Sequence, residues 1–352
     1  MTYRRWAVIG MAIALMAVSV AALCIGNPML APTSLFSVLG QPDSLEYVVL
    51  FELRLPRLLL GAAAGAAFAV AGLLLQESLR NPLAVPELLG VAPGAALVVA
   101  TIVVLGIPVP TAWLPVLSLI GALSGGILTL SIARRMTTPT AVLLGGSAVS
   151  AALGALVVAV VAMGEQLQIQ TLLRYLSGSL AGLTWPQVSP SLIWLLCLIP
   201  LTVLAVPALG VLRLGEEVAA SLGIKVSRTR LLILFLAALL VAIPVSVCGP
   251  IAWVGFLAPH LARRLFPLAS AKVWIPMSAL AGAVFTTTAD LAARTVFTPL
   301  ETPVGGWTAI IGVSVGAVLL GRRRRNARHS SAGRTSADKQ QAVTPAIDGP
   351  GR

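Results

Sequence analysis

The sequence is poor in charge and in aromatic side chains. Only 10% of its 352 residues are charged and 5% are aromatic, whereas soluble proteins carry about 25% charged residues. Hydrophobic residues make up 58% of the chain, and a water-soluble domain cannot bury so much apolar surface. This composition excludes a soluble enzyme, a soluble nucleic-acid-binding module and a disordered chain, and it indicates an integral membrane protein.

Cysteine and histidine are almost absent. Cys24, Cys197 and Cys248 lie far apart without CxxC spacing, and His260 and His329 are distant from each other. This pattern favours small core cysteines over a disulfide framework or a metal site. The chain also lacks GxxxxGK[ST], HExxH and GxSxG motifs, so we expect no catalytic residues, no metal and no cofactor in this chain.

Long apolar runs predict an all-α bundle of about ten membrane-spanning helices, because a span needs about 20 apolar residues and bilayer-embedded backbone must satisfy its own hydrogen bonds. The run at about 6–25 is interpreted as an uncleaved first span, with a cleaved signal peptide as the alternative. The run at 251–262 is too short to cross alone, so we expect it to be tilted, broken or supported by neighbours. The other predicted spans lie at about 58–76, 91–107, 113–133, 141–163, 188–209, 231–250, 274–292 and 303–321.

The distribution of basic residues predicts the orientation. With the amino terminus inside, almost all Lys and Arg fall in inner segments, and the outer segments hold only Arg54, Arg57, Arg174 and Arg294. An excess of Lys and Arg marks the cytoplasmic side, so both termini are predicted to be cytoplasmic and the net charge of +12 reflects topology rather than nucleic-acid binding. Residues 1–321 then form the membrane domain, and 322–352 a basic, disordered cytoplasmic tail.

Few charged residues lie near the predicted spans, and such residues are functional candidates. Arg54 and Arg57 flank Pro56 before the second span, so we expect outward guanidinium groups that anchor at the interface or bind carboxylates of an external partner. Asp290 and Arg294 are four residues apart, which predicts a helical ion pair. A structural pair is favoured over a proton relay because no second acid continues a path.

The inner segment at about 210–230, called the elbow here, predicts a short helix. It begins near Gly215, has Glu216 and Glu217 in its first turn, where acids suit the helix dipole, and ends at Gly223. Such a helix is either plain surface or fits a groove on another subunit. One apolar face is formed by Val218, Ala219 and Leu222.

A series of short segments runs in order from about residue 50 to 318. The segments are Arg54-Leu-Pro-Arg57, Gly72-Leu-Leu-Leu-Gln76, Arg80-Asn-Pro-Leu-Ala84, Leu89-Gly90, Tyr175-Leu-Ser-Gly-Ser179, Gly215-Glu-Glu217, Ser221-Leu-Gly223, Gly249-Pro-Ile251, Val254-Gly255, Pro259-His260-Leu-Ala-Arg263, Ala289-Asp290, Arg294 and Glu301-Thr-Pro-Val-Gly305. With this ordered set the chain resembles the FecCD-type permeases, the membrane subunits of ABC importers for iron–siderophore complexes, haem and cobalamin.

The resemblance implies a fold like that of the cobalamin importer permease and a subunit that passes a ferric siderophore, or a related metal chelate, across the cell membrane. Haem and cobalamin are alternative cargoes, and an ion-coupled secondary transporter is a more remote reading. The implied partners are a second permease copy or a related permease, an ATPase dimer that binds ATP and Mg, and an extracytoplasmic binding protein.

The resemblance also assigns roles to residues. Those matching the external docking site are Arg54, Arg57 and Arg294. Those matching the ATPase-coupling helix are Gly215, Glu216, Glu217, Ala220, Leu222 and Gly223. Those matching the cytoplasmic constrictions of the path, called the gate residues here, are Asn81, Leu83, Pro139 and Thr140. The chain departs from the family pattern at Val85, where an acid is frequent, and has Glu87 two residues later.

Overall fold

The computed structural model describes residues 2–33, 38–40, 43–136 and 138–316, and side chains from Arg5 onward. The chain divides into two units, Met1–Ala309 and Ile310–Arg352. The predicted basic tail lies outside the described residues. The described part of the chain is helical and contains no strand, which confirms the predicted all-α membrane fold.

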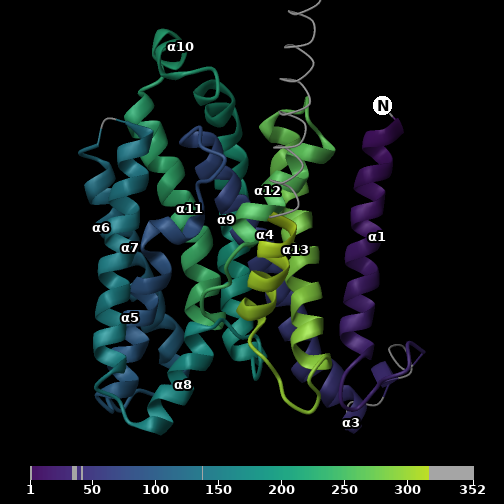
Figure 1. Cartoon of the computed structure of the whole chain (residues 1–352). Coiled ribbons are helices and arrows are strands. Elements are labelled where there is room, and N and C mark those ends of the chain that lie inside the picture. Colours follow the sequence, from purple (N-terminus) through teal and green to yellow (C-terminus); the bar gives the residue numbers. More distant parts are fainter. Residues whose placement is uncertain (1, 34–37, 41–42, 137, 317–352) are drawn as a thin grey trace, which may run out of the picture. The chain divides into compact units, whose positions relative to one another are not determined.

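Helices account for most of the described residues of the first unit (Figure 1). They are α1 (Thr2–Cys24), α3 (Leu45–Tyr47), α4 (Leu55–Ser78), α5 (Val91–Val104), α6 (Leu114–Ala133), α7 (Pro139–Val161), α8 (Gln166–Leu176), α9 (Trp185–Leu212), α10 (Glu216–Ser221), α11 (Val226–Cys248), α12 (Val254–Leu265) and α13 (Ala271–Thr295). Shorter segments are the π-helical η2 (Val48–Arg54) and the 3-10 turns η1 (Val38–Gly40), η3 (Pro86–Leu89) and η4 (Thr111–Trp113).

The predicted spans correspond to observed helices. Among the described residues, seven helices are long and apolar enough to cross a membrane, and Val91–Val104 and Val304–Gly316 are shorter apolar helices. The predicted short run is the 12-residue α12, which starts after a turn at Gly249 (φ 72°) and packs on α4 and α13. One predicted span was too short, because the helix that contains α4 runs without interruption over Leu45–Ser78.

Helix α8 was not predicted. Its 11 residues alternate polar and apolar side chains and lack the long apolar run of a span. Its start nevertheless carries a readable signal, because Glu165 and Gln168 form a reciprocal capping box of the kind that begins helices. The same arrangement begins α9, with Thr184 and Gln187.

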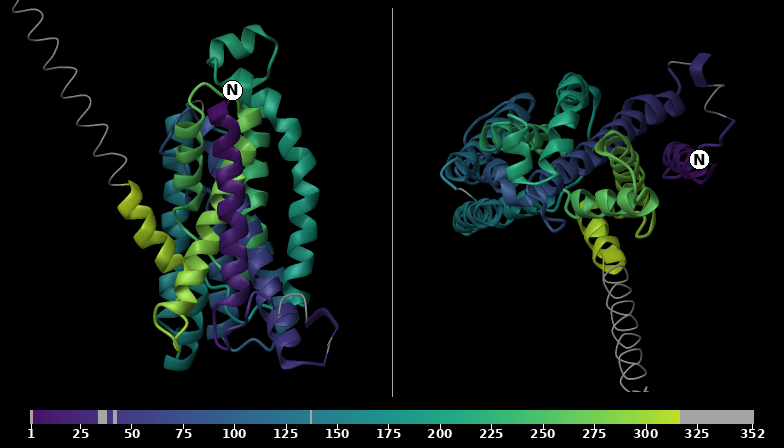
Figure 2. Two further views of the ribbon diagram at one scale, coloured as in Figure 1. Left: turned by 90° about the vertical axis from the view of Figure 1, so that its right-hand side faces the viewer. Right: turned by 90° about the horizontal axis from the view of Figure 1, so that it is seen from above.

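Helix α4 lies at the centre of the first unit and packs against α9, α11, α12 and α13. Viewed from above, it runs obliquely across the other helices (Figure 2). Two glycines permit this packing: a Cβ atom added at Gly65 would lie 2.3 Å from the carbonyl oxygen of Gly282, and one at Gly72 would lie 1.8 Å from that of Gly255. Lipid is as apolar as the helix surfaces, so the hydrophobic effect does not drive helices together in a membrane. Small residues allow the close backbone packing that holds them together instead.

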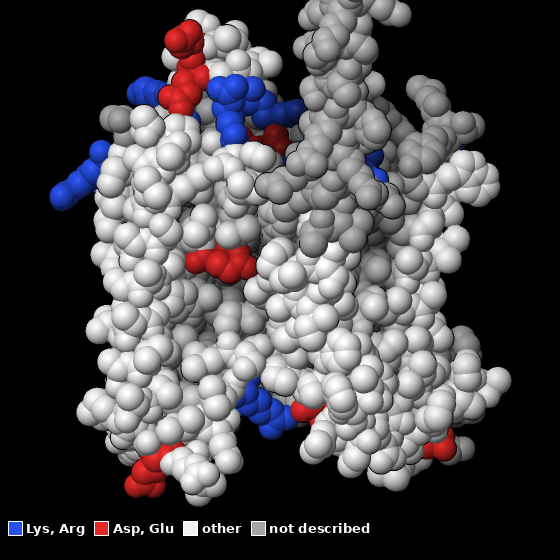
Figure 3. Space-filling model, in the orientation of Figure 1, with Lys and Arg blue, Asp and Glu red and all other residues white. Residues whose placement is uncertain are grey.

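Charged side chains lie towards two opposite ends. On the face drawn in Figure 3, the band between these ends is almost free of charge, apart from an acidic side chain in a hollow. Helix α4 begins beside Arg54 at one end and finishes at Ser78 near α10 at the other. We call the first the arginine end, after Arg54, Arg57 and Arg294, and the second the elbow end.

Gly72→Ala tests the contact between α4 and α12. The new methyl group meets backbone rather than a flexible side chain, so we expect a loss of stability of about 3 kcal/mol and a clearly lower Tm in detergent. The matched control is Gly154→Ala in α7, where nothing lies within 4 Å of the added Cβ, and its Tm should stay unchanged or rise slightly. Equal Tm values for the two variants would contradict this packing.

Candidate functional site

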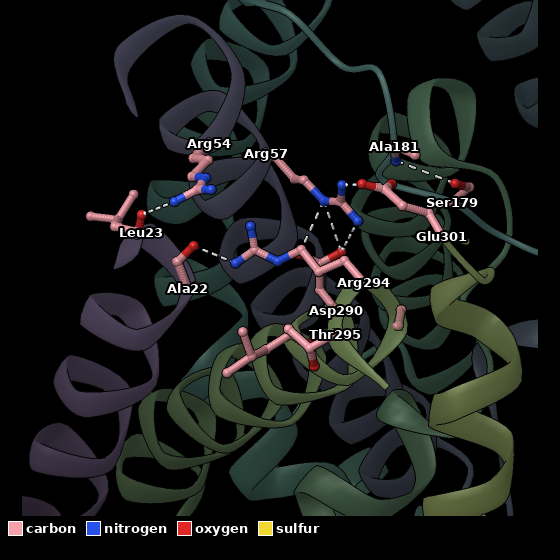
Figure 4. Close-up of polar contacts among 12 residues, drawn as sticks. Ala22, Leu23, Arg54, Arg57, Ser179, Ala181, Asp290, Arg294, Thr295 and Glu301 are labelled. Carbon is pink, nitrogen blue, oxygen red and sulfur yellow. Dashed lines mark hydrogen bonds and ion pairs between the residues drawn. The ribbon is translucent and has the colours of Figure 1, made fainter. Parts of the chain in front are cut away.

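Arg57 forms the centre of a buried charge cluster at the arginine end (Figure 4). It stands in the first turn of α4 and is 8% exposed. Its Nε donates to both carboxylate oxygens of Asp290 at 3.0 and 3.1 Å, and its Nη2 donates to Oδ1 at 2.9 Å. Its Nη1 donates to Oε2 of Glu301 at 2.9 Å. One guanidinium therefore joins α4, α13 and the segment before the helix Val304–Gly316.

The other two arginines of this end hold the last turn of α1. Arg54 Nη1 donates to the carbonyl oxygens of Leu23 at 2.7 Å and Cys24 at 3.2 Å, and Arg294 Nη2 donates to that of Ala22. The carboxyl end of a helix carries a partial negative charge, so cations are favourable there. Both side chains are covered in the single chain: Arg54 is 7% exposed, and the side chain of Arg294 is also 7% exposed. The outward orientation predicted from the sequence stays a prediction, as does the docking role of these arginines.

Asp290 lies closer to Arg57 than to Arg294 and makes its hydrogen bonds with Arg57. The predicted i, i+4 pair exists, but Arg294 Nε lies 3.9 Å from Oδ2 of Asp290, a full 1 Å farther than the closest contact of Arg57 at 2.9 Å. The Nε atom of Arg294 is buried and has no hydrogen-bond partner. A cation with an unused donor is a natural contact for one more carboxylate.

A pocket of about 290 Å³ opens among these groups. Three arginines face two carboxylates, so the cluster carries a surplus of one positive charge. The pocket therefore suits an acidic group more than a neutral one. Its lining includes Gly26, Asn27, Arg54, Arg57, Gly182, Arg294, Thr298 and Glu301.

The elbow end carries the predicted short helix. Helix α10 follows Gly215 (φ 115°), has Glu216 and Glu217 in its first turn and is followed by Gly223 (φ 82°), as predicted. The predicted single apolar face is divided: Ala219 is fully buried, whereas Val218 and Leu222 are 44% and 60% exposed. Ala220 is also exposed. Val218, Ala220 and Leu222 therefore leave apolar surface uncovered at this end of the single chain.

The gate residues lie at the same end. Asn81 Oδ1 accepts from the backbone N–H of Leu83 at 2.9 Å, and Leu83 is 61% exposed. Pro139 occupies the first turn of α7, with Thr140 beside it. The residues flanking the two segments line one small apolar pocket, to which Leu79, Val85, Ala133 and Val142 contribute. The two segments that carry the gate residues therefore border a common pocket, and their role as constrictions stays a prediction.

Sequence reasoning gave no role to three acids, of which Glu87 was named only as a departure from the family pattern. Glu301 was noted only within a motif, yet it is a second partner of Arg57. Glu77, at the end of α4, binds Arg213 and Arg263. Glu87 lies in η3 and has one buried carboxylate oxygen without a hydrogen-bond partner. The available signal was the same each time: an acid next to an apolar run, where an unpaired charge is costly.

Comparison with known proteins agrees with this arrangement. The pattern of the FecCD transport family matches residues 14–322. The Fe(3+)-citrate import system permease protein YfmE of Bacillus subtilis is 35% identical over 89% of this chain and 94% of its own length. The Fe(3+) dicitrate transport system permease protein FecD of Escherichia coli is 38% identical over 79% of this chain and 87% of its own length.

A solved structure described as an inward-facing conformation of a metal-chelate type ABC transporter aligns with a TM-score of 0.76. It is 29% identical to this chain, and the alignment covers 89% of this chain and 97% of that one. The fold and the family match define a multi-pass permease subunit of an ABC importer in the inner membrane. The chain belongs to the FecCD transport family.

Asp290→Asn tests the buried cluster. The change leaves Arg57 without its bidentate partner, and removing one member of a buried ion pair costs about 3 kcal/mol or more. We expect a lower Tm for the purified protein, and a smaller loss in the double variant Arg57→Gln/Asp290→Asn than the sum of the two single losses. The exposed acid of α3 offers the control Glu46→Gln, which should leave the Tm unchanged. Additive losses would contradict the pairing.

Proposed function

We propose that this chain carries a ferric siderophore, or a related chelate such as ferric citrate, from an external binding protein to the cytoplasm, with energy from a separate ATPase. The observation that carries the proposal is the contrast between the two ends. A carboxylate-accepting pocket lies at one end, and a helix with exposed apolar side chains lies at the other. The iron-citrate names of YfmE and FecD support an iron chelate as cargo.

The arginine end is proposed to face outward and receive the binding protein. The surplus positive charge and the unused donor of Arg294 suit glutamates or aspartates on its surface. Arg54, Arg57 and Arg294 would then leave or share their present partners when docking occurs. The basic residues of the elbow end support the opposite placement, with α10 in the cytoplasm.

The elbow is proposed to dock on the ATPase, which binds ATP and Mg. Leu222 and Val218 supply apolar contact, and Glu217 supplies charge. The permease itself contributes no chemistry to hydrolysis. Its part is to open alternately to the two sides, a two-state change whose populations are shifted by the partners.

The path is proposed to run past the gate residues, with a second copy or a related permease completing its wall. Asn81, Leu83, Pro139 and Thr140 are the constriction nearest the cytoplasm. Small and aliphatic side chains suit a bulky chelate, whereas a bare ion needs coordinating groups. No group of three or more His, Cys, Asp or Glu that could hold a metal occurs among the described residues.

Opposite changes in charge test docking at the arginine end. Glu301→Gln removes a half-exposed carboxylate and should tighten binding of the cargo-loaded binding protein about five-fold, the equivalent of about 1 kcal/mol. Arg54→Gln should weaken it by a similar factor. Both effects should shrink at high salt. Titration of the permease–ATPase complex in nanodiscs at low and high salt measures them, and two changes of the same sign would reject the docking site.

ATP-driven uptake tests the function itself. Proteoliposomes with permease, ATPase and binding protein should accumulate one ferric chelate from a panel that also contains haem and cobalamin, and only when ATP is supplied to the ATPase side. Leu222→Asp should reduce retention of the ATPase about ten-fold or more. The matched control is Leu167→Asp on α8, which is 78% exposed at the other end, and it should retain the ATPase. Uptake without ATPase would favour a secondary transporter.

A further inference from the structure

The last turn of α4 is held by arginines from three other elements. Both carboxylate oxygens of Glu77 are engaged: Arg213 Nε lies 2.9 Å from Oε2, and Arg263 Nη1 lies 3.1 Å from Oε1. Arg263 also donates to the side-chain oxygen of Gln76, and Arg230 Nε donates to the carbonyl oxygen of Ser78 at 3.3 Å. The side chain of Glu77 is 9% exposed, so this acid depends on its partners for compensation.

Two of these arginines flank α10. Arg213 directly follows α9 and stands three residues before the first residue of α10. Arg230, on α11, binds Oε1 of Glu216 in α10 at 2.6 Å with its Nη2. The elbow is therefore fixed on both of its sides to the end of α4, through Glu77 on one side and the Ser78 carbonyl on the other. Arg213 also stacks over the ring of Trp274 in α13 at 4.2 Å.

The chain leads directly from Glu77 to the gate residues. Arg80, three residues on, has φ 49°, an uncommon conformation for a side chain with a Cβ. A Cβ built at Gly215 would lie 3.7 Å from Nη1 of Arg80, so Arg80 extends to the start of the elbow. The backbone N–H of Asn81 donates to the Gln76 carbonyl at 3.0 Å. Leu83 is in turn held by the Asn81 side chain.

Because Glu77 is shared between two arginines, the elbow can move without leaving this buried acid unpaired. When a buried acid loses its one partner, an uncompensated charge remains. Glu77 keeps Arg263 on α12 as a second partner, so Arg213, whose side chain is 37% exposed, can shift with the elbow while it stays paired with the other carboxylate oxygen. The two arrangements can therefore differ little in free energy, as a two-state element requires.

We propose that Glu77 is a positioning residue that connects the elbow to the gate residues, so that a displacement of α10 is transmitted through Arg213 and Arg230 to Asn81 and Leu83. This inference rests on the proposed function, because it assumes that α10 contacts the ATPase. It describes how a movement caused at that contact reaches the membrane domain. Glu77 itself touches neither the cargo nor the ATPase in this account.

The test compares transported cargo with hydrolysed ATP. Glu77→Gln, Arg213→Gln and the double variant are assembled with ATPase and binding protein in proteoliposomes. Both rates are measured for each complex.

Each single variant should keep its ATPase and continue to hydrolyse ATP, while the cargo moved per ATP falls about five-fold or more. The double variant should be no worse than the more affected single variant, because both changes break one connection. Arg134→Gln, an exposed arginine at the same end, should leave the ratio unchanged.

Three results would overturn the inference. The first is a wild-type ratio in Glu77→Gln and Arg213→Gln. The second is a proportional loss of assembly, hydrolysis and transport with a lower Tm, because a purely structural role predicts an unchanged ratio. The third is additive loss in the double variant. If the wild-type complex shows no ATP-driven uptake at all, the proposed function fails and this inference fails with it; if it shows uptake, only the inference is at stake.

Discussion

The requirement that a charge inside a membrane protein be met by another charge governs both ends of α4. Arg57 at its start is held by Asp290 and Glu301, and Glu77 at its end is held by Arg213 and Arg263. Between them α4 is almost wholly apolar and contacts its neighbours through glycine. The two clusters therefore tie both ends of the central helix to its neighbours, and the surrounding helices pack along the apolar length between them.

The two ends also differ in their charge and in the side chains that they expose. At the arginine end, positive charge is in surplus and one donor of Arg294 is unused. At the elbow end, Glu216 and Glu217 begin α10, and the exposed side chains of Val218 and Leu222 lie in this helix and directly after it. In the function proposed above, the arginine end receives the cargo and the elbow end receives the energy, and the few charges of the sequence lie at these two ends.

Composition and long apolar runs were sufficient to predict the fold, because a bilayer leaves helices as the natural form for such segments. The elbow was also predictable, since its glycines and paired acids are local signals. The bounds of the second span were not, because Arg54 interrupts the apolar pattern while the helix continues through η2. The burial of the arginines and their pairing with acids could not be predicted either. Arg57 and Asp290 are 233 positions apart in the sequence, and they meet only because α4 packs on α13.

Helix α1 is attached to the rest of the unit in an unusual way. Its span is only 11% buried, and its last turn is held by Arg54 and Arg294 through backbone carbonyl oxygens. A neutral carbonyl is a weaker acceptor for a guanidinium than a carboxylate is. Along its length α1 packs on α13 through apolar side chains, whereas its carboxyl end depends on two guanidinium groups. Loss of either arginine would therefore loosen the end of α1 while its apolar packing on α13 remains.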